Sequence, residues 1–253
     1  MCGVIAALLT RASGYLDDMV ILPFFIILAA VISLMIGTEH SDGAMRNKII
    51  SGHTKGNVFL SQLIVYLVFA FVAAALYLGA FSIFMIGHVG AFPTYALIVS
   101  AIGFLLVSLS YTVILATLSM MISQKAVSAV ICLLLVVATV LSIYAIDDAL
   151  AQREFIYMEI EMGECSYTIN EPNPRYIGGA ARRTMEFIRN IIPYGPTLQY
   201  MDMVSPAFRP WDVTLTLSAE EANLLAILPM YSITESALIG AIGWLCFRKK
   251  ELK

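Results

Sequence analysis

The sequence predicts an all-α membrane protein, a bundle of helices that crosses the bilayer several times. The chain of 253 residues is 60% hydrophobic and 13% charged, with a mean hydropathy of +0.85. Soluble domains are about 45–50% apolar and about 25% charged. Several apolar runs also reach the roughly 20 residues that a helix needs to cross a hydrocarbon core. We therefore expect one transmembrane domain over residues 1–253.

Five apolar runs are long enough to span the bilayer. The expected spans are 19–37, 58–86, 94–122, 126–146 and 222–247. The second run carries no ionisable side chain and is longer than the bilayer is thick, so it must tilt or project from it. Residues 1–18 precede the first span, and a large loop over 147–221 precedes the last one.

The positive charges predict how the bundle is oriented, because short loops rich in Lys and Arg stay in the cytoplasm. One side of the predicted bundle collects Arg46, Lys48, Lys55, Lys125, Arg248, Lys249, Lys250 and Lys253. The long loop on the other side holds twelve acidic residues against six arginines. We therefore expect a multi-pass protein of the cell membrane. Its segment 38–56 and its C-terminus would face the cytoplasm, and its N-terminal segment and the loop 147–221 would lie outside.

The charged segment 38–56 is the most informative part of the chain. Asp42, Arg46 and Lys48 would be costly inside hydrocarbon, so this segment must lie at or outside the membrane surface. A compact helix of mixed charge, bounded by glycines, is suited to contact another protein. The alternative is a solvated linker that only fixes the topology.

A short amphipathic helix is expected within this segment. Met45, Ile49 and Ile50 stand at positions i, i+4 and i+5 and are expected to share one face. Asp42-Gly43 suits the start of this helix, and Gly52 suits its end. Such a helix can lie on the membrane or insert into a groove of a partner.

The same segment carries a pattern of glycines and charges. Gly37, Glu39, Gly43, Arg46, Asn47 and Lys48 form G-x-E-x-x-x-G-x-x-R-N-K, and Gly52-His53-Thr54-Lys55 follows. This pattern resembles the cytoplasmic loop of ABC-2 type permeases, the membrane subunits of ATP-binding cassette exporters. The order of the spans and the ending Phe247-Arg248-Lys249-Lys250 are also similar to that family, so the resemblance covers essentially the whole chain.

The resemblance implies a permease subunit that moves an unidentified substrate outward, driven by a separate ATPase subunit that pushes on the loop helix. The chain has no G-x-x-x-x-G-K-[ST] phosphate loop, so ATP hydrolysis is expected on that partner and no enzyme activity here. A second permease copy, as a homodimer or heterodimer, and membrane lipid are further expected partners. No cofactor and no nucleic acid are expected. The expected coupling residues are Glu39, Asp42, Gly43, Met45, Arg46, Asn47, Lys48, Ile49, Ile50 and Gly52.

The family differs from this chain at its start. It usually has six spans with both ends in the cytoplasm, whereas five are expected here. This difference predicts a first helix upstream of Met1, and insertion of the first span as a reversed anchor is the alternative.

Glu235 is the one carboxylate deep within an expected span, about 18 Å along the helix from Arg248. Ionisable groups inside a membrane are candidates for function, so Glu235 is a candidate for the translocation path. The structural alternatives are a protonated Glu that hydrogen-bonds to a neighbouring helix, such as one bearing Ser108, Ser110 or Tyr111, or a Glu that faces a wet cavity. An ion-coupled secondary transporter or channel that uses Glu235 is the alternative function. A membrane partner protein that transports nothing is a third.

Three further expectations concern the remaining motifs. His40, Asp42 and His53 lack the spacing of a metal site, so none is expected. Residues 178–192 predict an amphipathic helix, either on the outer membrane surface or within a folded outer cap. Two pairs of small residues four apart, Ala75 with Gly79 and Ser236 with Gly240, predict close helix contacts within the chain or between two copies.

Overall fold

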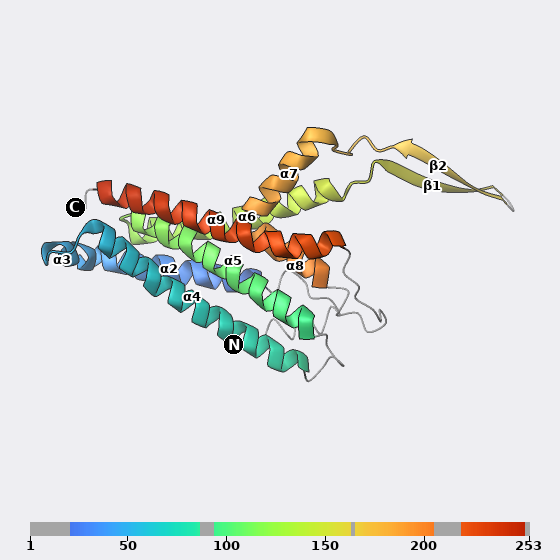
Figure 1. Ribbon diagram of the computed structural model, residues 1–253. Helices are drawn as coiled ribbons and strands as arrows, with labels where there is room; N and C mark the ends of the chain where they lie inside the picture. Colours follow the sequence, from blue (N-terminus) through green and yellow to red (C-terminus); the bar gives the residue numbers. More distant parts are fainter. Residues whose placement is uncertain (1–20, 87–93, 163–164, 205–218, 251–253) are drawn as a thin grey trace.

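The computed structural model describes residues 21–86, 94–162, 165–204 and 219–250, and this part of the chain forms eight helices and one β-hairpin (Figure 1). The long helices are α2 (Leu22–Ser41), α4 (Lys55–Ile86), α5 (Thr94–Met121), α6 (Lys125–Ala151) and α9 (Ala219–Lys249). All five contain a stretch long and apolar enough to cross a membrane. The expected helical membrane bundle with five spans is thereby confirmed.

Shorter elements connect the long helices. They are α3 (Ala44–Ile50), β1 (Phe155–Met162), β2 (Cys165–Pro172), α7 (Gly179–Ile191) and α8 (Tyr194–Val204). The two strands pair antiparallel from Phe155 opposite Pro172 to Met162 opposite Cys165. The hairpin corrects the expected all-α class, because the loop 147–221 contains this sheet. Residues 1–18 and the end of that loop near Ser218 lie outside the described residues.

Two long helices extend beyond their expected ends. Helix α2 continues to Ser41, so Thr38–Ser41 form its last turn instead of a loop. Helix α6 continues past Ile146 to Ala151. In that extension Asp147 pairs with Arg189 of α7 at 2.6 Å, so its charge is used in a contact between helices.

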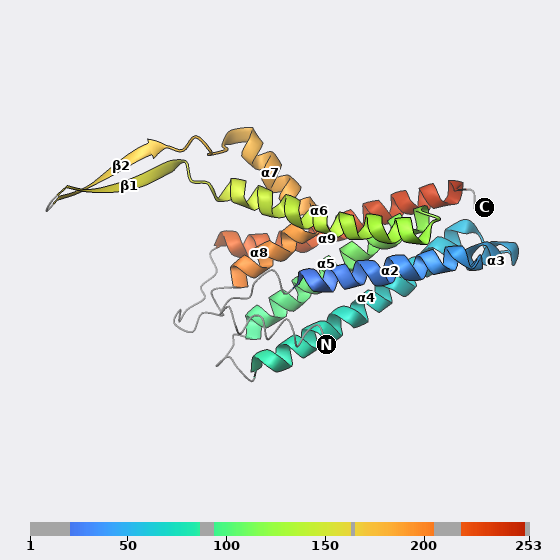
Figure 2. The same cartoon turned by 180° about the vertical axis from the view of Figure 1, so that it is seen from behind.

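Helix α5 is the centre of the bundle, because it contacts α2, α4, α6 and α9. Figures 1 and 2 show it between the other helices from both sides. A cluster of aromatic rings joins three of these helices near the start of α2. The ring centroids of Phe24, Tyr77 and Phe104 lie 4.9 to 5.4 Å apart, and Phe25 lies 4.5 Å from Tyr111. Ring pairs at such distances stabilise the packing beyond what the burial of their apolar area contributes.

Small residues bring α9 close to α4 and α5. A Cβ atom at Gly243 would overlap the methyl of Thr117 and lie 3.0 Å from Phe59, and one at Gly240 would lie 3.7 Å from Val113. The expected close contact near Ser236 and Gly240 therefore lies within this chain. In contrast, Gly79 has open space around its Cα, so the pair Ala75 and Gly79 lies on an exposed face of α4.

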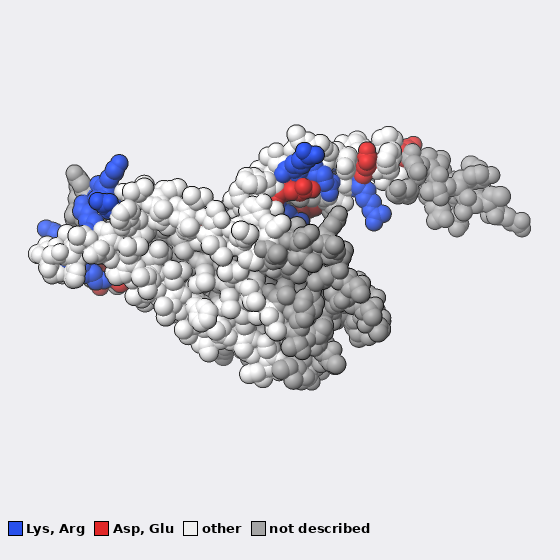
Figure 3. Space-filling model, viewed as in Figure 1, with Lys and Arg blue, Asp and Glu red and all other residues white. Residues whose placement is uncertain are grey.

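One group of basic residues lies at the end of the bundle that we name the α3 end, and a second group, mixed with acidic residues, lies near α7 and the hairpin (Figure 3). The α3 end is formed by α3, the starts of α4 and α6 and the end of α9 (Figure 1). Lys55 Nζ donates to the carbonyl of Lys250 at 2.7 Å, and Lys250 Nζ donates to the carbonyl of Met120 at 2.9 Å. Burial lowers the pKa of the Lys250 amine. These contacts hold the ends of α4, α5 and α9 together.

The opposite end, which we name the hairpin end, carries α7, α8 and the β-hairpin. The hairpin projects away from the bundle (Figures 1 and 2). Residues 193–200, at the start of α8, are buried, and the ring of Tyr200 lies directly on Gly103 of α5. Helix α7 ends at Ile191, close to the expected end at residue 192, and a buried helix follows it and packs onto the bundle.

A pair of substitutions tests the packing of α9. Gly243→Ala adds a methyl group where Thr117 and Phe59 leave no room, and overpacking costs about 1–3 kcal/mol. Gly79→Ala adds the same group in open space and should gain up to about 1 kcal/mol from helix propensity. Thermal unfolding in one detergent should show a lower midpoint for Gly243→Ala only. Equal midpoints for the two variants would contradict this packing.

Candidate functional site

Helix α3 is fixed at both ends by glycines in the left-handed conformation. Gly43 has φ = 69°, ends α2 and accepts a hydrogen bond from the amide of Asn47 at 2.9 Å. Gly52 has φ = 99°, and its amide donates to the carbonyl of Ile49 at 3.0 Å, while His53 donates to Lys48 at 3.2 Å. These two bonds form a Schellman motif, which satisfies the last carbonyls of the helix. The expected bounds of the short helix are confirmed.

One carboxylate ties α3 to the two helices beside it. Lys48 Nζ of α3 donates to Glu39 Oε2 of α2 at 3.0 Å, and the amide of Gln62 in α4 donates to the same oxygen. The ion pair alone is partly exposed and contributes at most about 1 kcal/mol. Gln62 is buried, so loss of its acceptor would leave an unsatisfied amide, at about 1–3 kcal/mol. Glu39 and Lys48 therefore position α3 and do not form a free surface.

The expected single apolar face of α3 is wrong. Met45 is 1% exposed and belongs to the core, whereas Ile50 is 73% exposed. Five helical residues turn the chain by about 140° beyond a full turn, so Met45 and Ile50 cannot face the same partner. Ile49, about 40° from Met45, is partly buried. Met45 therefore anchors α3 to its own chain, since α3 contacts α2 and α4.

An outward face of α3 stays available to a partner. Ile50 is the large apolar side chain on this face, and four other exposed residues lie around it: Asp42, Arg46, Asn47 and Gly52. This outer face of α3 combines an apolar contact with a cation and two polar groups. Of the expected coupling residues, these five could touch another protein, while Gly43 shapes the backbone.

His40 stabilises the α3 end and lies apart from any set of metal ligands. Its Nε2 atom is 3.2 Å from the carbonyl oxygen of Met120, the same oxygen that Lys250 contacts. Among the described residues, no three His, Cys, Asp or Glu side chains come together as metal ligands. His40 thus joins the end of α2 to the end of α5.

Glu235 lies near the middle of α9, about 20 Å from either end of that helix. Its Oε2 atom accepts a hydrogen bond of 2.9 Å from the hydroxyl of Ser110, which is fully buried in α5. One of the structural alternatives, a hydrogen bond to the helix bearing Ser110, is therefore present. The same carboxylate also lines a cavity.

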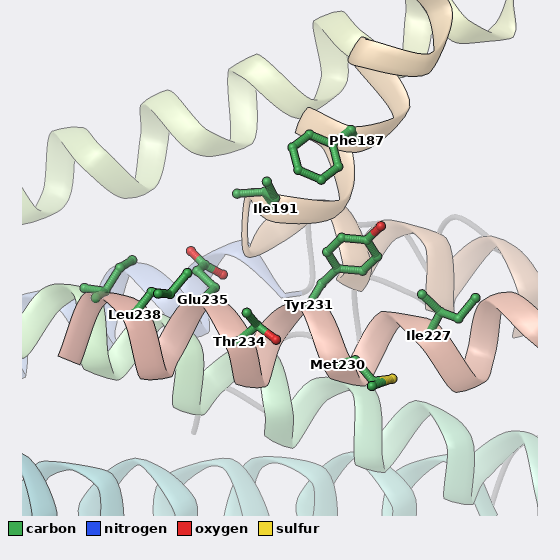
Figure 4. Close-up of a pocket in the computed structure, with 9 residues that line it drawn as sticks. Phe187, Ile191, Ile227, Met230, Tyr231, Thr234, Glu235 and Leu238 are labelled. Atoms are coloured by element: carbon green, nitrogen blue, oxygen red, sulfur yellow. The ribbon is translucent and has the colours of Figure 1, made fainter. Parts of the chain in front are cut away.

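This cavity is a groove of about 490 Å³ between α7 and α9 (Figure 4). Its lining residues are Phe187, Ile191, Ile227, Met230, Tyr231, Thr234, Glu235, Leu238 and Ile239. Most of them are apolar, and Glu235 is the only one that carries a charge. The sequence did not reveal this groove, because α7 lies about 45 residues before Glu235 in the chain.

Helix α7 presents different residues to the helices on its two sides. Phe187 and Ile191, one turn apart, point towards α9 (Figure 4), and the rings of Phe187 and Tyr231 lie 6.3 Å apart at 73°. On the other side Arg189 pairs with Asp147 of α6 at 2.6 Å, and Arg182 Nη2 donates to the carbonyl of Leu150 at 3.0 Å. These polar contacts hold the apolar side of α7 over the groove. The expected amphipathic helix is confirmed.

Comparison with protein-family models, with curated proteins and with solved structures finds no match for this chain. Two features of the described residues can bear on function, the outer face of α3 and the groove at Glu235.

The two apolar residues of α3 that face opposite ways give a direct test of its placement. Met45→Ala removes a core side chain and should cost about 2–5 kcal/mol of stability. Ile50→Ala removes an exposed side chain and should stay within about 0.5 kcal/mol. Denaturant unfolding of both variants in mixed micelles measures the difference. If Met45→Ala is as stable as the wild-type chain, Met45 is not buried and lies on the outer face.

Proposed function

We propose that the chain is the transmembrane permease subunit of an ABC-2 type exporter and that α3 couples it to a separate ATPase subunit. The observation that carries this proposal is the geometry of α3. It lies at the basic end of the bundle, is fixed to α2 and α4 through Glu39, and keeps an outer face with Ile50 at its centre. A helix that only linked two spans would need neither the fixed position nor the exposed apolar anchor.

In this proposal the α3 end faces the cytoplasm and the hairpin end faces outward. A force on the outer face of α3 passes to α2 and α4, because the ion pair of Lys48 with Glu39 and the bond from Gln62 join the three helices. ATP is bound and hydrolysed on the partner. Exposed apolar side chains on α4, such as Ile64, Val68 and Leu76, would contact lipid or a second permease copy.

Thiol labelling tests the orientation. In a background with Cys2, Cys132, Cys165 and Cys246 changed to Ala, two exposed positions receive a cysteine: Ser51, beside α3, and Glu171, in the hairpin. An impermeant maleimide added to intact cells should label Glu171→Cys and spare Ser51→Cys. Both should react once the cells are permeabilised, which controls for access. Labelling of Ser51→Cys from outside would reverse the orientation and remove the coupling role.

Affinity for the ATPase subunit tests the coupling role. The full chain is purified with its ATPase from native membranes, and the separated subunits are titrated against each other. Truncating an apolar anchor in a helix-in-groove contact costs on the order of 2 kcal/mol, or roughly 30-fold in affinity. Ile50→Ala should show this loss, and Arg46→Glu should slow association, because rim charges act mainly on orientation.

The controls make the same chemical changes at the hairpin end. Ile156→Ala and Arg175→Glu alter exposed residues far from α3 and should leave ATPase affinity unchanged. If all four variants bind the ATPase subunit as tightly as the wild-type chain does, α3 is only a linker. If no ATPase co-purifies at all, ion-coupled secondary transport through Glu235 becomes the leading function, since its carboxylate already lines a groove.

A further inference from the structure

We propose that the groove between α7 and α9 binds an amphiphilic organic cation, an apolar molecule that carries one ammonium or similar group, with Glu235 as its counter-ion. The geometry of the groove alone supports a binding site. That an exported molecule binds there rests on the proposed function. A carboxyl group, apolar walls and a pair of aromatic rings define the groove.

The groove contains one carboxyl group, that of Glu235. In the middle of a spanning helix such a group is either protonated or paired with a positive charge, because an unpaired charge there is costly. Ser110 donates to one of its oxygens, and none of the ion pairs found among the described residues includes Glu235. Arg189 of α7 lies on the side away from the groove, where it pairs with Asp147 of α6. A cationic ligand would provide the missing charge.

The walls of the groove are mostly apolar. Ile191, Ile227, Met230 and Leu238 offer an apolar surface for a hydrocarbon or ring system. This volume of about 490 Å³ is of the size of small-molecule sites, which combine apolar walls with few polar groups. A small inorganic ion would leave this apolar surface unused, so the groove favours an amphiphile over a bare metal ion.

A pair of aromatic rings lies beside the carboxyl group. Phe187 of α7 and Tyr231 of α9 meet edge to face, and Tyr231 stands one helical turn before Glu235 (Figure 4). Aromatic faces attract organic cations through the ring quadrupole. An anion would be repelled by both the carboxylate and these faces. The groove is therefore selective for positive charge, and helix α7 is part of the site.

The test uses two probes of equal shape and opposite charge, tetraphenylphosphonium and tetraphenylborate. Each is titrated against the full chain in lipid nanodiscs, and binding to empty nanodiscs is subtracted. The cation should bind to the wild-type chain and the anion should not. Glu235→Gln removes the charge at constant shape and should weaken binding of the cation about tenfold or more. Tyr231→Leu should weaken it about threefold, whereas Tyr231→Phe keeps the ring and should not.

Glu186→Gln is the matched control, because it makes the same change on α7 beside Arg182, on the side away from the groove. It should leave binding of the cation unchanged. Equal binding of both probes, or equal cation binding by Glu235→Gln, would overturn the inference. So would no binding at all, which would mean that lipid or a second copy fills the groove. The assay contains no ATPase, so its outcome and that of the coupling experiment are independent.

Discussion

The cost of placing charge in hydrocarbon is the constraint on which this structure depends. Between the two ends of the five long helices, the sequence carries a single charged residue, Glu235. In the part of the chain that the structure describes, the charged side chains visible in Figure 3 lie at the α3 end or at the hairpin end, where water or a partner group can satisfy them. Between these two ends the helices are held together by close packing, through the aromatic rings around Phe104 and through glycines such as Gly243. Charge exclusion thus gives the bundle its two chemically distinct ends.

At the α3 end the few charges act within the chain as much as towards a partner. Glu39 accepts from both Lys48 and Gln62, so one carboxylate sets the position of α3 relative to two spanning helices. The motif that resembles ABC-2 permeases therefore divides into two groups of residues. One group fixes the position of α3: Glu39, Lys48, Gly43 and Gly52. The other group, Arg46 and Asn47, lies on the exposed outer face. A motif read along the chain does not separate these groups, because separation needs the neighbouring helices.

The spans could be predicted from the sequence because burial in lipid requires about 20 consecutive apolar residues, a signal local to each helix. The hairpin was not predicted, because apolar and polar residues alternate only over 158–162, a short stretch that follows the apolar residues 155–157. The apolar role of Met45 was predicted but its direction was wrong, since the side of α3 that packs inward depends on α2 and α4. The groove needed tertiary contacts: nothing local to Phe187 indicates that it faces Tyr231.

A continuous structural route joins the two candidate sites. Helix α4 is linked to α3 through Gln62, which shares the Glu39 carboxylate of α2 with Lys48, and it packs through Gly56 directly against Trp244 of α9. Glu235 stands nine residues before Trp244 on the same helix, about 14 Å along its axis. Because Gly243 leaves no space between α9 and α5, these two helices would move as one body when α3 is displaced. Ser110 of α5 would then stay with Glu235, and the change would occur against α7, whose polar contacts lie on α6. The wall formed by α7 is thus the part of the groove that a displacement of α3 would open or close.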